Sequence, residues 1–126
     1  SVVEGCDANG CEYMTGGEIV ILGNIGDNFA AGMTGGIAFV YDPKNIFENY
    51  VNSTSVIWQK PETKYWKERL KSLLEEYNSE TGSKISKYIL ENFSKEVENF
   101  KQICPIEMLD KLENPITLRK EKQKAI

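Results

Sequence analysis

Apolar residues along the chain follow two different spacings, and the change between them falls near residue 43. Before this point the apolar runs are short, follow glycine pairs and show no polar alternation, which is typical of strands buried on both faces. In the second half apolar residues recur every three or four positions, which predicts amphipathic helices. We therefore divide a single domain into strands at 1–43, an extended connection at 44–62, a helical cap at 63–113 and a flexible basic tail at 114–126.

A four-residue repeat marks the strand half. The sequence Met-Thr-Gly-Gly occurs at 14–17 and again, 19 positions later, at 33–36, and a short apolar run follows each copy. A repeat of this length is too short for a pair of helices with their turns, but it fits one coil of a parallel β-solenoid. We therefore expect the two copies to form parallel strands stacked one above the other, with the C-terminal helices closing the end of the solenoid.

Seven glycines are expected at the corners of these coils, where the backbone turns sharply and neighbouring coils approach closely. Glycine suits such a corner because it adopts positive φ and has no Cβ. The expected corner glycines are Gly16, Gly17, Gly23, Gly26, Gly32, Gly35 and Gly36. Two coils are fewer than the roughly three repeats that a solenoid needs, so we expect further coils upstream. Without them the first strand presents an open edge through which the chain can self-associate.

Three or four helices are expected in the second half. The first begins after Thr63 and ends at Gly82, and the second follows Ser83. A third is capped by Ser94 and stopped by Pro105, and a weaker fourth segment comes after it. The apolar stripe of the first helix consists of Trp66, Leu70, Leu73, Leu74 and Tyr77. The apolar residues of the third are Val97, Phe100 and Cys104.

Charge is distributed unevenly along the chain. The 126 residues contain 15 Lys and Arg, 19 Asp and Glu and no His, which gives a formal net charge of −4. Every base lies at Lys44 or later, whereas residues 1–43 contain six acids. A segment without a base cannot neutralise phosphates, so we expect no nucleic acid and no anionic membrane as its partner. The basic run at 119–124 is expected to be solvated.

The cysteines and the hydropathy indicate the environment of the chain. No apolar run approaches the roughly 18 residues that span a bilayer, so we expect no membrane segment. The cysteines Cys6, Cys11 and Cys104 are odd in number and contain no C-x-x-C pair, which argues against a disulfide framework and a zinc site. We interpret the thiols as reduced and expect an intracellular location, in the cytoplasm or an organelle.

Two acidic or glycine-rich features of the first half are candidates for chemistry. The glycine-rich stretch contains no G-x-G pair and no Lys, so it does not match a phosphate-binding loop. A pair of carboxylates for acid/base catalysis could come from Glu4, Asp7 and Glu12, but solvated loop charges are the simpler interpretation.

Three aromatic residues, Trp58, Tyr65 and Trp66, are more typical of packing between helices and strands than of stacking on a ligand. The residues taken by themselves therefore predict no catalytic, cofactor-binding or metal-binding position in this chain.

Several runs of residues carry a resemblance to a known family. The runs are Val3-Glu4-Gly5, the octapeptide at 10–17, the thirteen residues at 28–40, Thr81-Gly82-Ser83 and the pentapeptide at 89–93. Together they closely resemble the C-terminal domain of glutamate synthases, which is named GXGXG for its glycine repeats. The resemblance implies the fold of that domain, a right-handed parallel β-helix followed by closing helices.

The resemblance covers about residues 2–105 and is most specific at 1–41. This chain departs from the family pattern at 6–9 in a turn, at Tyr77 and Glu80 where the family has histidines, and at Phe93 where it has a tryptophan. These departures lie in a turn and in the helical part, so the implied fold is unaffected.

The resemblance also implies a function for the parent enzyme. A glutamate synthase takes the amide nitrogen of glutamine as ammonia, passes it through a tunnel and adds it to 2-oxoglutarate, with reduction through FMN, to make glutamate. In that family the glutaminase nucleophile, the FMN and the iron–sulfur cluster belong to other domains, and no position here matches their motifs. The implied role of this chain is a scaffold for the glutaminase and synthase domains, with no activity and no cofactor of its own.

Two alternatives remain open at this point. The same glycine repeat occurs in a subunit of formylmethanofuran dehydrogenase, so the chain could belong to such a complex. It could also be a plain protein-interaction module. The sequence does not reveal whether the parent's electron donor is NADH, NADPH or ferredoxin.

Overall fold

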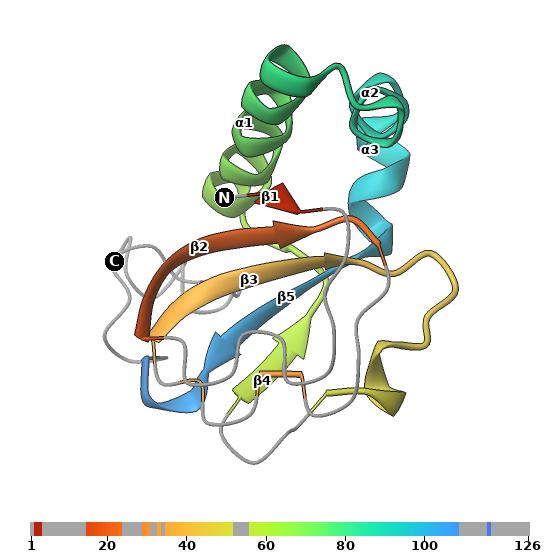
Figure 1. Ribbon diagram of the computed structural model, residues 1–126. Helices are drawn as coiled ribbons and strands as arrows, with labels where there is room; N and C mark the ends of the chain where they lie inside the picture. The colour runs from red at the N-terminus through yellow and green to blue at the C-terminus, as the bar shows by residue number, and fades with distance from the viewer. Residues whose placement is uncertain are drawn as a thin grey trace.

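A single five-stranded sheet with helices on one side forms the centre of the computed structural model (Figure 1). The structure describes residues 2–3, 15–23, 29–30, 33, 35–51, 56–108 and 116. The strands are β1 (Val2–Val3), β2 (Thr15–Ile21), β3 (Gly35–Tyr41), β4 (Val56–Gln59) and β5 (Phe100–Pro105). The helices are α1 (Lys64–Thr81), α2 (Lys84–Glu91) and α3 (Phe93–Glu96), with 3₁₀ turns η1 (Phe47–Asn49), η2 (Val97–Asn99) and η3 (Ile106–Met108).

The sheet mixes parallel and antiparallel pairing, in the order β1-β2-β3-β5-β4. Strands β1, β2 and β3 run parallel, whereas β5 is antiparallel to both β3 and β4. The prediction of a right-handed parallel β-helix is therefore wrong. The edge of β3 that a further coil would occupy is paired instead with β5, and the sheet stays open rather than coiling (Figure 1).

The two copies of the repeat lie side by side in this sheet, as the sequence predicted. The pairs from Glu18 with Ile37 to Ile21 with Val40 keep the 19-residue separation of the repeat. Thr15, however, pairs with Gly35, so β2 carries one more residue than β3 before the regular ladder begins. This extra residue is a β-bulge, and Gly17 within it has φ +83°.

The predicted corner glycines occupy several different environments. Gly16 and Gly17 lie within β2, Gly35 and Gly36 open β3, and Gly23 follows the end of β2. Positive φ, +83°, occurs at both Gly17 and Gly36, the second glycine of each repeat. Gly26 and Gly32 lie outside the described residues. The corner role of the set as a whole stays a prediction.

The first two predicted helices are confirmed. Helix α1 ends at Gly82, whose φ of +66° is the left-handed conformation that glycine favours at a helix end. Helix α2 begins after Ser83, and the Ser83 hydroxyl oxygen accepts a hydrogen bond from the Ser86 N–H. Thr63 precedes α1 as predicted, but its hydroxyl oxygen makes no capping bond and is buried with no hydrogen-bond partner in the described part of the chain.

The third predicted helix is wrong. Residues after α3 make only one 3₁₀ turn and then form β5, all six residues of which are buried. Phe100 and Cys104 belong to the core on one face of the sheet and Ile103 to the core on the other. A strand covered on both faces loses the apolar and polar alternation that identifies strands, so its apolar residues fell on a helical spacing. The segment at 44–62, for which an extended connection was expected, contains the 3₁₀ turn η1 and the strand β4.

The two faces of the sheet have separate cores. On one face Phe39, Val20 and Phe100 pack with Leu70, Leu74 and Ile89 of helices α1 and α2. The core of the other face consists mainly of Ile21, Phe29, Met33, Ala38, Val40, Phe47, Val56 and Ile103. Arg69 of α1 also donates from Nε to both carboxylate oxygens of Glu18 on β2, at 2.9 and 3.0 Å. The helices are therefore fixed to the sheet by packing and by a charged contact.

Replacing Gly17 with Ala should lower the free energy of unfolding by about 1–2 kcal/mol, because a residue with a Cβ is strained at positive φ. The added Cβ meets no atom within 4 Å, so the loss measures the backbone alone. Chemical denaturation followed by circular dichroism provides the measurement. Gly23→Ala is the control, because Gly23 is not among the described glycines with positive φ and no backbone strain is expected there. Equal effects at both positions would contradict the positive φ assigned to Gly17.

Candidate functional site

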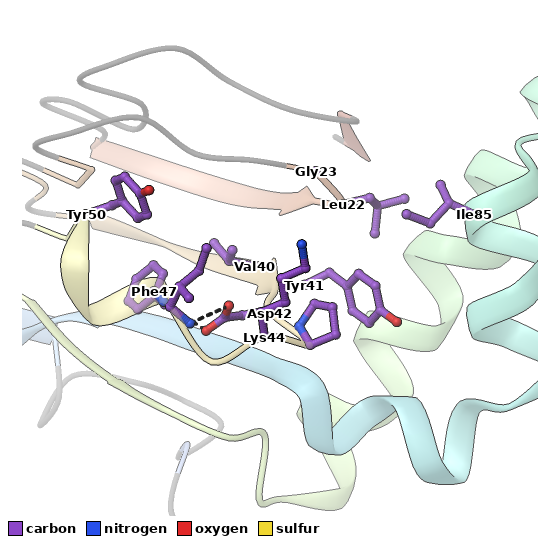
Figure 2. A pocket seen from close by; sticks show the side chains of 11 residues that line it. Leu22, Gly23, Val40, Tyr41, Asp42, Lys44, Phe47, Tyr50 and Ile85 are labelled. Atoms are coloured by element: carbon purple, nitrogen blue, oxygen red, sulfur yellow. Dashed lines mark hydrogen bonds between the residues drawn. The ribbon is translucent and has the colours of Figure 1, made fainter.

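A cavity of about 430 Å³ opens at the carboxyl ends of β2 and β3 (Figure 2). In open sheets with parallel strands, this end of the strands is where ligands usually bind. Leu22 follows β2 and lies next to Ile85 of α2, whereas Phe47 and Tyr50 lie toward the opposite end of the cavity (Figure 2). Gly23 also follows β2. The remaining wall comes from β3 and the turn after it, and consists of Val40, Tyr41, Asp42, Pro43, Lys44 and Ile46.

Asp42 organises the turn that forms one wall of the cavity. Its carboxylate accepts hydrogen bonds from the backbone N–H groups of Ile46, at 2.9 Å, and Phe47, at 3.0 Å (Figure 2). Asn45, at φ +56° in the same turn, accepts a hydrogen bond through Oδ1 from Lys101 Nζ at 2.8 Å. Both carboxylate oxygens of Asp42 are therefore engaged by the backbone, and the turn is held in one shape.

A buried carboxylate adjoins this cavity. Glu96 on α3 is 4 % exposed, and its carboxylate accepts hydrogen bonds from the Tyr41 hydroxyl at 2.5 Å and from Asn99 Nδ2 at 3.1 Å. The Tyr88 hydroxyl of α2 lies 3.5 Å from the other carboxylate oxygen. Since Tyr41 ends β3 and also lines the cavity, this cluster ties the helices to the cavity wall.

The titration behaviour of the cluster follows from these contacts. The hydrogen bond from Tyr41 is the main cause that holds the pKa of Glu96 below its ordinary value, and it outweighs the opposing effect of burial. Burial raises the pKa of Tyr41, and the hydrogen bond to Glu96 and its negative charge raise it further. At neutral pH the carboxylate is thus charged and the phenol neutral. Neither group titrates near pH 7, so the pair is poorly suited to general acid/base catalysis.

The other side chains that were considered for chemistry are either unreactive or lie outside the described residues. Burial raises the pKa of the Cys104 thiol to about 11, so it is a poor nucleophile. Among the described residues, no group of three or more His, Cys, Asp or Glu side chains could hold a metal ion. No helix within the described ranges is long and apolar enough to cross a membrane. The candidates Cys6, Cys11, Glu4, Asp7 and Glu12 lie outside the described residues.

The predicted packing of aromatic residues between helices and strands is confirmed for Trp66, whereas Trp58 packs in the core of the opposite face and Tyr65 contacts its own neighbour in α1. Trp66 is buried against Phe39, with ring centroids 6.2 Å apart, and Trp58 packs on Phe47 at 5.7 Å. Tyr65 contacts Trp66 and is 45 % exposed. Sequence reasoning missed the Tyr41, Asp42 and Glu96 contacts. The Asp42-Pro43 pair was a turn signal for Asp42, whereas the pairing of Tyr41 with Glu96 spans 55 residues and leaves no local signal.

Replacing Glu96 with Gln should lower the free energy of unfolding at pH 7 by about 1.5–3 kcal/mol, since it removes charged hydrogen bonds. The pKa of Glu96 lies below the ordinary 4.5 in the folded chain, so its stabilisation is complete above that pH and is lost as the pH falls further. Denaturation between pH 7 and pH 3 should show a shallower acid loss in the variant than in the wild type.

Glu98→Gln is the matched control for this experiment. The side chain of Glu98 is 59 % exposed, and its ion pair with Lys60 is long, at 4.0 Å. Its stability should change by less than about 0.5 kcal/mol. If both variants follow the acid dependence of the wild type, Glu96 does not have the assigned role.

Comparison with known proteins identifies relatives of the chain over most of its length. The glutamate synthase [NADPH] large chain of Azospirillum brasilense is 53% identical over 119 residues, which are 94% of this chain and 8% of that protein. The ferredoxin-dependent glutamate synthase of Antithamnion sp. is 48% identical over 105 residues, 83% of this chain and 7% of that protein. The glutamate synthase [NADH] of Schizosaccharomyces pombe is 38% identical over 125 residues, 96% of this chain and 6% of that protein.

The resemblance to glutamate synthases is therefore confirmed, although this chain spans less than a tenth of the length of these relatives. A family model described as GXGXG motif matches residues 1–106, which include both copies of the glycine repeat and every described strand. The chain belongs to the GXGXG motif family.

Proposed function

We propose that this chain is a structural segment of a glutamate synthase, an enzyme that makes glutamate from glutamine and 2-oxoglutarate. The observation that carries the proposal is the 53% identity to the Azospirillum brasilense large chain over 94% of this chain. FMN and an iron–sulfur cluster are proposed for the parent enzyme, in regions outside this chain. A reducing compartment inside the cell is proposed as well, because the cysteines are odd in number and contain no C-x-x-C pair.

The names of the relatives support a role that is independent of the electron donor. The three relatives are described as using NADPH, ferredoxin and NADH respectively, yet each aligns with at least 83% of this chain. A segment that contacted the donor would be expected to differ among these classes. We therefore propose that this chain neither binds nor selects the donor.

The chemistry of the described residues supports a scaffold. The buried carboxylate of Glu96 and the carboxylate of Asp42 are both engaged in internal hydrogen bonds, and the Cys104 thiol is buried. These groups stabilise the fold and offer no reactive atom to a substrate. We propose that the segment holds the glutaminase and synthase domains of the parent in register.

An exchange of segments tests this proposal in a working enzyme. The matching segment of the Azospirillum brasilense large chain is replaced by this chain, and glutamate formation from glutamine and 2-oxoglutarate is measured with NADPH. We expect the chimaera to keep activity within about tenfold of the parent, since most of the contacts of a scaffold are preserved at this identity. This chain alone is expected to form no glutamate.

The control is a chimaera that carries Leu74→Asp in the inserted segment. Leu74 is fully buried between α1 and the sheet, so its replacement by a charge unfolds the segment. Its activity should be lost together with its stability. A chimaera that is folded and assembled but inactive would contradict the proposed function.

We also propose that the separate chain self-associates through the β1 edge of the sheet. Strand β1 pairs only with Val20 and Ile21 of β2, so the preceding residues of β2 have no strand partner on that side among the described residues. Unpaired backbone groups at such an edge can pair with another copy. Sedimentation velocity should show a larger species that grows with concentration, whereas a monomer at all concentrations would argue against this.

A further inference from the structure

The cavity at the ends of β2 and β3 combines a largely apolar wall with one base, Lys44, that has no acidic partner among the described residues. Leu22, Val40 and Phe47 are buried, and Ile85 is partly buried, so the wall is largely aliphatic and aromatic. Among the described residues of the wall, Asp42 is the only acid, and it is engaged by two backbone N–H groups. Lys44 is exposed, and among the described residues it has no ion pair or hydrogen bond.

Among the described residues of the cavity wall, Ile46 is the large apolar side chain that is most exposed to solvent. Four large hydrophobic side chains of the described residues are exposed, at Ile46, Tyr65, Tyr88 and Ile106, and of these Ile46 is the one that lines the cavity. Its side chain is 40 % exposed beside Lys44, while its backbone is fixed by Asp42. The turn therefore presents Ile46 and Lys44 on a backbone that Asp42 holds in place, which favours binding because the backbone loses little conformational entropy.

We propose that this cavity is the docking site for another region of the glutamate synthase polypeptide, which inserts one large apolar side chain and pairs a nearby Asp or Glu with Lys44. The inference rests on the proposed function, since more than nine-tenths of each relative's length lies outside the segment that matches this chain. The segment that docks in the cavity comes from that remaining part of the polypeptide. The positive charge of Lys44, which has no acidic partner among the described residues, favours a negatively charged group beside it.

The volume and the wall fit this occupant. The 430 Å³ cavity is within the roughly 300–1,000 Å³ range of sites that enclose an organic group. Interfaces obtain most of their affinity from a few large apolar side chains that fill such pockets, with charged groups at the rim that orient the partner. Lys44 at the rim and the apolar interior match that arrangement. The segment that docks here therefore contains a large apolar residue within a few positions of an acidic one.

The test uses the active chimaeric enzyme described above. Ile46→Gln is compared with Ile106→Gln, since both isoleucines are exposed to a similar degree, 40 % and 48 %, and only the first lines the cavity. Both variants of the separate chain should melt like the unsubstituted chain. In the assembled enzyme, limited proteolysis of the inserted segment should be roughly tenfold faster for Ile46→Gln and unchanged for Ile106→Gln.

Zero-length carbodiimide cross-linking of the same enzyme identifies the partner directly. Mass spectrometry should find Lys44 joined to an Asp or Glu outside the inserted segment, in a peptide with a large apolar residue nearby, and Lys44→Glu should abolish that link. Links from Lys44 only to residues within the segment, or equal proteolysis of the two isoleucine variants, would overturn the docking site. An enzyme that makes glutamate but shows these results keeps the proposed function, whereas a folded but inactive chimaera overturns both.

Discussion

Strand β3 is paired along both of its edges, in parallel to β2 and in the opposite direction to β5, and the arrangement of the described residues depends on this double pairing. The antiparallel partner brings the C-terminal part of the chain into the middle of the sheet. Because α1 and α2 lie between β4 and β5 in the chain, the pairing of β5 with both β4 and β3 also places the helices over one face. Phe29, Met33 and Phe47 pack in the core on the other face.

The sequence predicted those features that depend on neighbours in the chain. The glycine repeat predicted the parallel pairing of its two copies, and Gly82 and Ser83 predicted the end of α1 and the start of α2. A solenoid did not follow, because two similar strands side by side are equally compatible with an open sheet. Strand β5 was missed because Lys101 and Gln102 suggest an exposed helix face, although both side chains are buried.

The candidate site was harder to predict, because its residues meet only through the fold. Tyr41 ends β3 and Lys44 and Ile46 belong to the turn after it, but Leu22 and Ile85 reach the cavity from the end of β2 and from α2. The internal hydrogen bonds of Asp42 and Glu96 explain why acidic residues in this region do not produce a reactive site. The same contacts make the wall of the cavity rigid, which is what a scaffold needs when it positions other parts of an enzyme. This rigidity supports the proposed scaffold role.

The antiparallel pairing of β5 is most directly tested by nuclear magnetic resonance on the labelled chain. The account predicts cross-strand nuclear Overhauser effects between the backbones of Ala38 and Ile103 and between those of Gln59 and Gln102, with slow amide exchange along β5. Sequential amide-to-amide effects typical of a helix from Val97 to Cys104, with no contact to β3, would contradict it.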